Sequence, residues 1–96
     1  MGEEKKVILD LTGAESVSRI HENMKEAFDF PDYYGKNWDA LYDCLCDLLT
    51  DGEKYEVEVR GFYSMAAAIR TRCAPMLTVF GDAQEEWGNL KVTVFS

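Results

Sequence analysis

Histidine is scarce in this sequence, and glycine-rich loops, long apolar runs and linker segments are missing. His21 is the only histidine, and the nearby Ser16 and Ser18 are read as helix caps, so a catalytic triad is not expected. No glycine-rich phosphate loop is present, and no apolar run approaches the length of a membrane span. These absences argue against a hydrolase of the triad type, a phosphate-loop protein and a membrane-spanning protein.

Cysteines are too few and too irregularly spaced for a disulfide framework. The three of them, Cys44, Cys46 and Cys73, include no CxxC motif and no paired histidine and cysteine spacing, which also argues against a zinc site. The charged N-terminal residues 3–6 are not followed by the apolar h-region of a signal peptide, so no signal peptide is expected. We therefore expect a reduced, cytoplasmic protein that uses no metal and no other cofactor.

Basic residues are outnumbered by acidic residues, 10 against 18, which gives a formal net charge of −8 and a pI near 4.5. Nucleic acids and anionic membranes are therefore disfavoured partners, because both are polyanions. A basic protein is the natural alternative. The apolar content of 47% and the aromatic content of 12% are typical of a folded chain. The length of 96 residues suffices for one compact domain, 1–96, with one core.

Hydrophobic periodicity and capping signals predict seven elements of secondary structure. Three are strands, over residues 6–11, 55–60 and 90–95, and four are helices, over about 17–28, 38–49, 64–72 and 75–87. Ser16 or Ser18 caps the first helix and Asn37 the second, whereas Pro75 suits the first position of the fourth. The order βααβααβ predicts an α/β fold with a three-stranded parallel sheet. Periodicity leaves the order of the strands in that sheet open.

The helix predicted over 38–49 carries an unusual charge pattern. Its apolar side is formed by Leu41, Cys44, Leu45 and Leu48, and its opposite side carries Asp39, Asp43 and Asp47 at four-residue intervals. Asp51 continues the spacing just beyond the helix. Repulsion between like charges four residues apart costs about 0.2–0.5 kcal/mol per pair, so the stripe destabilises the helix that carries it. Residues 29–53 have a net charge of −6, and the remaining residues share only −2.

Several interpretations of this stripe are open. A solvated polar face usually mixes charges of both signs, which this one does not. A calcium site is disfavoured because the spacing lacks the EF-hand pattern. An acid–base pair is disfavoured because carboxylates one turn apart on a convex helix lack a cleft and divergent environments. A surface that faces a cationic partner fits the pattern best.

The segment 31–45, which reads PDYYGKNWDALYDCL, closely resembles the signature of the barstar family of intracellular inhibitors of the ribonuclease barnase. The spacing of its tyrosines, glycine, asparagine and aspartates is reproduced without a gap. The rest of the chain resembles the family more weakly, through the same βααβααβ order and a final apolar strand. The resemblance implies a single barstar-like domain and a protein that is not itself an enzyme.

The resemblance also implies which residues contact the partner. In the family, the second helix and the loop before it enter the substrate cleft of the ribonuclease, where acids occupy sites meant for RNA phosphates. Carried over position by position, the contacts are Tyr33, Asn37, Asp39, Tyr42, Asp43, Asp82 and Glu86, with Asp47 nearer the rim. Asp43 corresponds to the dominant acid of the family, and Asp82 stands where the family has a second contacting acid.

The sequence departs from the best-known family member at several of these positions. Tyr42 and Leu48 replace tryptophans, Trp38 replaces a leucine, Asp82 replaces a glutamate, and Asn89 lies near the place of a second cysteine. The segment 47–55 is also longer. Two functions are compatible with the resemblance and the charge. The first is an inhibitor of a basic ribonuclease that is monomeric when free, and the second is a barstar-like module that binds another cationic protein.

Overall fold

The computed structural model describes residues 4–32 and 34–95. They form the strands β1 (Glu4–Asp10), β2 (Lys54–Arg60) and β3 (Leu90–Val94), the α-helices α1 (Val17–Phe28), α2 (Trp38–Leu49) and α3 (Ala67–Trp87), and the 3-10 turn η1 (Phe62–Ser64). The strands are parallel and lie in the order β1-β2-β3. This arrangement confirms the predicted three-stranded parallel sheet and settles the order of its strands.

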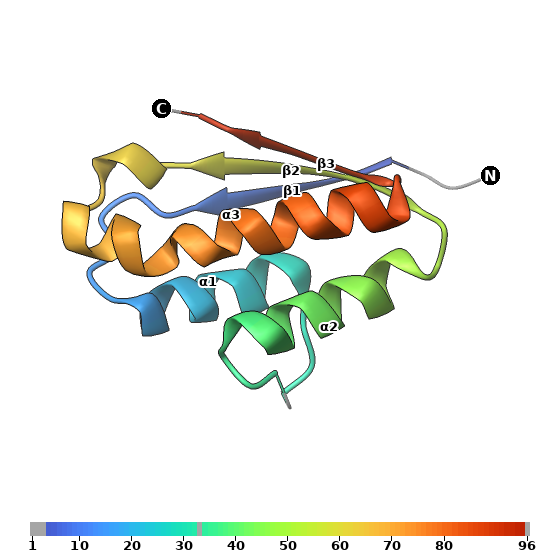
Figure 1. Ribbon diagram of the computed structural model, residues 1–96, viewed down its shortest axis with the longest axis horizontal. Coiled ribbons are helices and arrows are strands. Elements are labelled where there is room, and N and C mark those ends of the chain that lie inside the picture. Colours follow the sequence, from blue (N-terminus) through green and yellow to red (C-terminus); the bar gives the residue numbers. More distant parts are fainter. Residues whose placement is uncertain (1–3, 33, 96) are drawn as a thin grey trace.

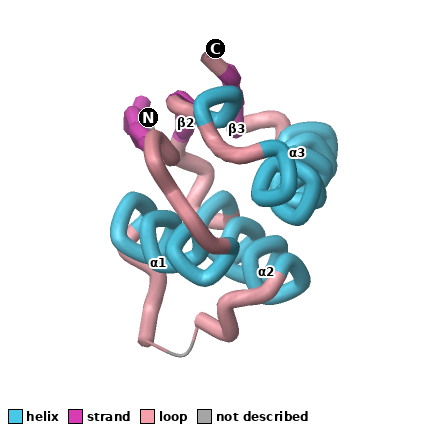
Figure 2. Tube along the Cα trace, turned by 90° about the vertical axis from the view of Figure 1, so that its left-hand side faces the viewer, coloured by secondary structure: helices cyan, strands magenta, loops and turns pink. Residues whose placement is uncertain are grey.

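The three α-helices of the described chain lie on one side of the sheet (Figure 1 and Figure 2). α1 packs against β1 and α3 against β3, whereas α2 lies farther from the sheet and packs against α3. The core between these layers contains the fully buried side chains Leu9, Leu11, Ile20, Met24, Leu41, Leu45, Leu49, Val57, Val59, Cys73, Met76 and Phe80. Burial of this apolar surface fixes α2 beside α3.

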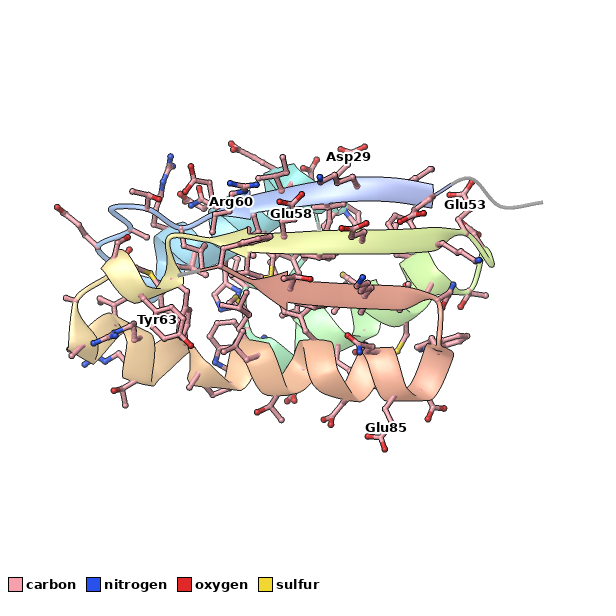
Figure 3. All side chains as sticks on the ribbon, turned by 90° about the horizontal axis from the view of Figure 1, so that it is seen from above. Asp29, Glu53, Glu58, Arg60, Tyr63 and Glu85 are labelled. Carbon is pink, nitrogen blue, oxygen red and sulfur yellow. The ribbon has the colours of Figure 1, made fainter. Side chains whose placement is uncertain are left out.

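The opposite face of the sheet carries charged side chains, as the alternation of β2 predicts. Glu58 is buried on this face, where its carboxylate pairs with Lys6 of β1 and with Arg60, whose Nη2 lies 2.6 Å away. Figure 3 shows Glu58 and Arg60 together on β2. The two cations compensate for the loss of water around the buried carboxylate. This cluster therefore has a structural role in the sheet.

The prediction of four helices is wrong. Residues 75–87 and most of the segment 64–72 belong to one continuous helix, α3, which runs through Pro75, and residues 62–64 form the turn η1. Proline inside a helix removes a hydrogen bond and costs about 3 kcal/mol. Pro75 is exposed, so water can reach the carbonyl group that loses its donor. On the inner side, Cys73 and Met76 are both fully buried, and this packing continues across the proline and holds the helix together.

Candidate functional site

The start of α2 is fixed by Asn37. This residue has extended backbone angles, and its Oδ1 accepts a hydrogen bond from the backbone N–H of Ala40 at 2.8 Å, which is the geometry of an N-cap. Its Nδ2 donates to the carbonyl group of Gly35 at 3.3 Å. Asp39 follows in the first turn, where the helix macrodipole stabilises a carboxylate. The cap therefore positions the first acid of the stripe.

An open groove of about 700 Å³ lies between α2 and α3. It is lined by Trp38, Asp39, Tyr42 and Asp43 of α2 and by Val79, Asp82, Glu85 and Glu86 of α3. Five of these eight side chains are carboxylates, and no basic residue of the described chain is among them. Acids from two separate helices thus meet on one concave surface. We call these eight residues the acidic groove.

The two helices run in the same direction along the acidic groove (Figure 1). Near the C-terminal ends of both helices, Trp87 of α3 joins them, because its Nε1 lies 3.3 Å from Sγ of Cys46. The neighbouring Cys46 side chain raises the pKa of Tyr42, with burial and the carboxylates of Glu86 and Asp82 adding to the effect. The phenol therefore remains protonated at neutral pH and offers a hydrogen-bond donor among the acids.

The structure brings most of the expected contact residues together. Asp39, Tyr42, Asp43, Asp82 and Glu86 line the acidic groove, and Asn37 caps the helix beside it. Tyr33 lies outside the described residues. Figure 3 shows Glu85 projecting from α3 away from the sheet, on the helix that supplies the second wall of the groove.

Asp47 lies off the acidic groove, on another side of α2. A step of four residues turns an α-helix by about 400°, so the aspartate stripe advances by about 40° at each step. Asp47 and Asp51 line a smaller hollow of about 200 Å³ together with Asp29, beside Phe30 and Leu48. The stripe therefore winds around α2, and its first two acids alone belong to the groove.

Three groove residues, Trp38, Val79 and Glu85, were not expected from the sequence. A signal for each was nevertheless present. Trp38 stands one helical turn before Tyr42, and Val79 and Glu85 stand three residues on either side of Asp82. Residues at such spacings share one side of a helix, so a projection of both helices would have placed them with the acids.

Asn89 ties the segment after α2 to the start of β3. Its Nδ2 donates to the carbonyl groups of Leu49 at 3.0 Å and of Glu53 at 2.8 Å. Two backbone acceptors are satisfied by one amide, so the longer connection between α2 and β2 is held at both of its ends. This keeps the C-terminal end of α2 in place relative to the sheet.

The carboxylates of the acidic groove are spread along its length. Within residues 4–32 and 34–95, no three His, Cys, Asp or Glu side chains lie close enough together to hold a metal ion. Spread carboxylates create an extended negative potential, so the groove is suited to an extended cationic surface.

Across that same part of the chain, no helix combines the length and the apolar character needed to cross a membrane.

Comparison with known proteins places the chain in a family. The family model described as barstar, the barnase inhibitor, matches residues 4–95. The chain belongs to the barstar family. Its similarity to YrdF of Bacillus subtilis (strain 168), a protein named as a candidate ribonuclease inhibitor, is 49% identity over 41 residues. That match covers 43% of this chain and 45% of YrdF, which is less than half the length of the relative. The range that matches the barstar family includes every described helix and strand.

Proposed function

We propose that this protein inhibits a basic ribonuclease by holding the acidic groove and the loop before α2 against the substrate cleft of the enzyme. The observation that carries the proposal is the groove itself, with five carboxylates from two helices in a member of the barstar family. A cleft that binds an RNA backbone is cationic. Carboxylates held at matching positions can occupy the sites of the phosphates.

The contacts that hold the two helices of the groove in place favour tight binding. Asn37 fixes the start of α2, and the contact between Cys46 and Trp87 joins α2 to the end of α3. Because both walls are ordered before the partner arrives, less conformational entropy is lost on binding. Charges that are already in place also speed the encounter with an oppositely charged protein.

Asp43 is the proposed dominant contact, with Asp39 second and Asp82 weaker. Asp43 and Asp39 stand one turn apart on α2, and Asp82 belongs to the opposite wall on α3, so a partner cation beside Asp43 is approached by carboxylates from both helices. The remaining proposed contacts are Tyr33, Asn37, Tyr42 and Glu86. Asp47, which lies around the helix, contributes to long-range attraction.

The proposed role is binding, not catalysis. The groove residues include no serine, cysteine, histidine or lysine within the described chain, and the raised pKa of Tyr42 keeps its phenol protonated, so the carboxylates have no activated nucleophile beside them. We propose that the free protein is a monomer and that it acts in the cytoplasm, where the RNA of the cell is exposed to a ribonuclease.

Inhibition of a purified barnase-type ribonuclease tests the proposal. Cleavage of a fluorogenic RNA is followed while the protein is titrated in, and loss of cleavage near equal concentrations is expected. The double variant Asp82→Lys with Glu86→Lys should inhibit far more weakly. The matched control, Glu4→Lys with Glu15→Lys, makes the same change in net charge at exposed positions outside the groove. Undiminished cleavage at excess wild-type protein contradicts the proposal and leaves a different cationic protein as the partner.

A further inference from the structure

His21, the single histidine, lies in a buried cluster behind the loop that leads into α2. It is 3% exposed, and its Nδ1 lies 2.6 Å from the hydroxyl oxygen of Tyr34, which is also buried. The imidazole ring packs against the indole of Trp38, with 4.3 Å between the ring centroids. One side chain of α1 therefore contacts both the loop and the first residue of α2.

Both partners of His21 belong to the surface that we propose as inhibitory. Trp38 lines the acidic groove, one residue before Asp39. Tyr34 lies in the loop before α2, next to the expected contact Tyr33 and three residues before the cap Asn37. A shift of Tyr34 or Trp38 would therefore move the groove wall and the start of α2 together.

The ion pairs between this loop and α1 are weaker contacts. Lys25 pairs with Asp32 at 3.0 Å and Lys36 with Glu22 at 3.7 Å, and both pairs are exposed to solvent. Exposed ion pairs contribute little. A buried hydrogen bond between two neutral side chains has a fixed geometry and loses little to competing water, so the contact between His21 and Tyr34 is suited to define where the loop lies.

We propose that His21 is a positioning residue for the partner-binding surface, because it holds Tyr34 and Trp38 in the arrangement that presents the loop and the acidic groove. The inference rests on the proposed inhibitory function. It gives the buried histidine a part in binding, although it has no contact with the partner. The variants below separate this role from a contribution to folding alone.

The protonation states of the pair suit this hydrogen bond. Burial lowers the pKa of His21, and the nearby Lys36 lowers it further, so the imidazole is neutral at neutral pH. Burial also raises the pKa of Tyr34, with a smaller effect from Cys44, so the phenol keeps its proton. A neutral imidazole can accept at Nδ1 a hydrogen bond that the phenol O–H donates.

The test compares His21→Leu, His21→Gln, Tyr34→Phe and the double variant His21→Leu with Tyr34→Phe. Dissociation constants for a barnase-type ribonuclease and free energies of unfolding in urea are measured for each. We expect His21→Leu and Tyr34→Phe each to weaken binding about tenfold, and the double variant to lose no more than the larger single loss. Glutamine can accept the same hydrogen bond, so His21→Gln should recover most of the affinity. Tyr63→Phe removes a hydroxyl group from an exposed tyrosine of η1 (Figure 3) and should bind like wild type.

Hydrogen exchange in the free protein makes the test independent of the ribonuclease. The amides of residues 34–42 should exchange faster in Tyr34→Phe than in wild type, while those of α3 stay unchanged. Affinities of all variants within threefold of wild type, or purely additive losses in the double variant, overturn the inference while inhibition by wild type stands. Absence of inhibition by wild type contradicts the proposed function. In that case unchanged exchange in residues 34–42 overturns the positioning role as well, and faster exchange supports it.

Discussion

Trp87 and Cys46 meet where the last turn of α3 passes the last turn of α2, with the indole nitrogen 3.3 Å from the thiol sulfur. The two residues are 41 positions apart in the sequence. Their contact joins α2 and α3 beyond the acidic groove, so the spacing of the two walls of the groove does not depend on the partner. A groove whose walls are already in place can present its carboxylates without first being ordered.

The contact between Trp87 and Cys46 predicts different effects for substitutions of the two residues. Trp87→Phe keeps an aromatic ring but removes the N–H group, so we expect a loss of about 1 kcal/mol in the free energy of unfolding. Cys46→Ser keeps an acceptor and should inhibit as wild type does, as should Cys44→Ala and Cys73→Ala after correction for stability. Urea unfolding and inhibition assays check both expectations. Weaker inhibition by a stable Cys46→Ser variant would show that the thiol itself takes part in binding.

Gly61, at the end of β2, is predicted to tolerate no side chain. Its φ of +76° disfavours other residues, and an added Cβ would lie 2.5 Å from the backbone nitrogen of Thr12. Gly61→Ala should therefore cost more than the about 1–2 kcal/mol of the left-handed conformation alone. Gly52→Ala is the control, because Gly52 has a φ of +79° with open space around it. Equal losses of unfolding free energy in the two variants would contradict the close approach of Thr12.

The buried His21 predicts that the protein loses stability in mild acid. Burial and then Lys36 lower its pKa below the ordinary 6.5. The unfolded chain therefore takes up a proton near pH 6.5 that the folded protein resists, and the free energy of unfolding falls as the pH drops from 6.5 toward the folded-state pKa. Urea unfolding is measured at about pH 7, 6 and 5.5. These pH values lie above the range in which most carboxyl groups titrate. His21→Gln should flatten the dependence, and an unchanged slope in that variant would exclude His21 as its source.

The parts of the site that depend on neighbouring residues were predictable from the sequence. Asn37 caps α2 as expected, because a cap is an interaction over three residues. The bounds of α2 follow from the same local signals and from its apolar stripe. The concentration of acids near Asp39 and Asp43 is likewise visible without a structure, since it depends on composition and helical spacing alone.

The parts that depend on packing between distant segments were not predictable. Pro75 is a valid signal for a helix start. α3 nevertheless continues through it, because Cys73 and Met76 on either side are buried in the core, and this packing cannot be read from the sequence. The contact between His21 and Tyr34 joins a helix to a loop, and no periodicity reports it. The groove itself exists only because α3 lies beside α2, which sets its second wall of acids opposite the first.

Carboxylates of the acidic groove, above all Asp43, are proposed to bind the cationic site of a ribonuclease. The most direct test measures the affinity of Asp43→Ala for a barnase-type ribonuclease beside Asp47→Ala, an equal truncation on the same helix but off the groove. Removing an acid that faces buried cations leaves them unpaired. The expected loss of about 4 kcal/mol or more is a magnitude taken from the barnase–barstar pair of this family, not from the geometry.

That loss corresponds to roughly a thousandfold weaker binding. Asp47→Ala should change mainly the association rate and its dependence on salt. Thermal unfolding of Asp43→Ala should be unchanged or slightly shifted upward, because the variant removes repulsion from Asp39 and Asp47. Binding of Asp43→Ala within about threefold of wild type, roughly 0.6 kcal/mol, would contradict the account.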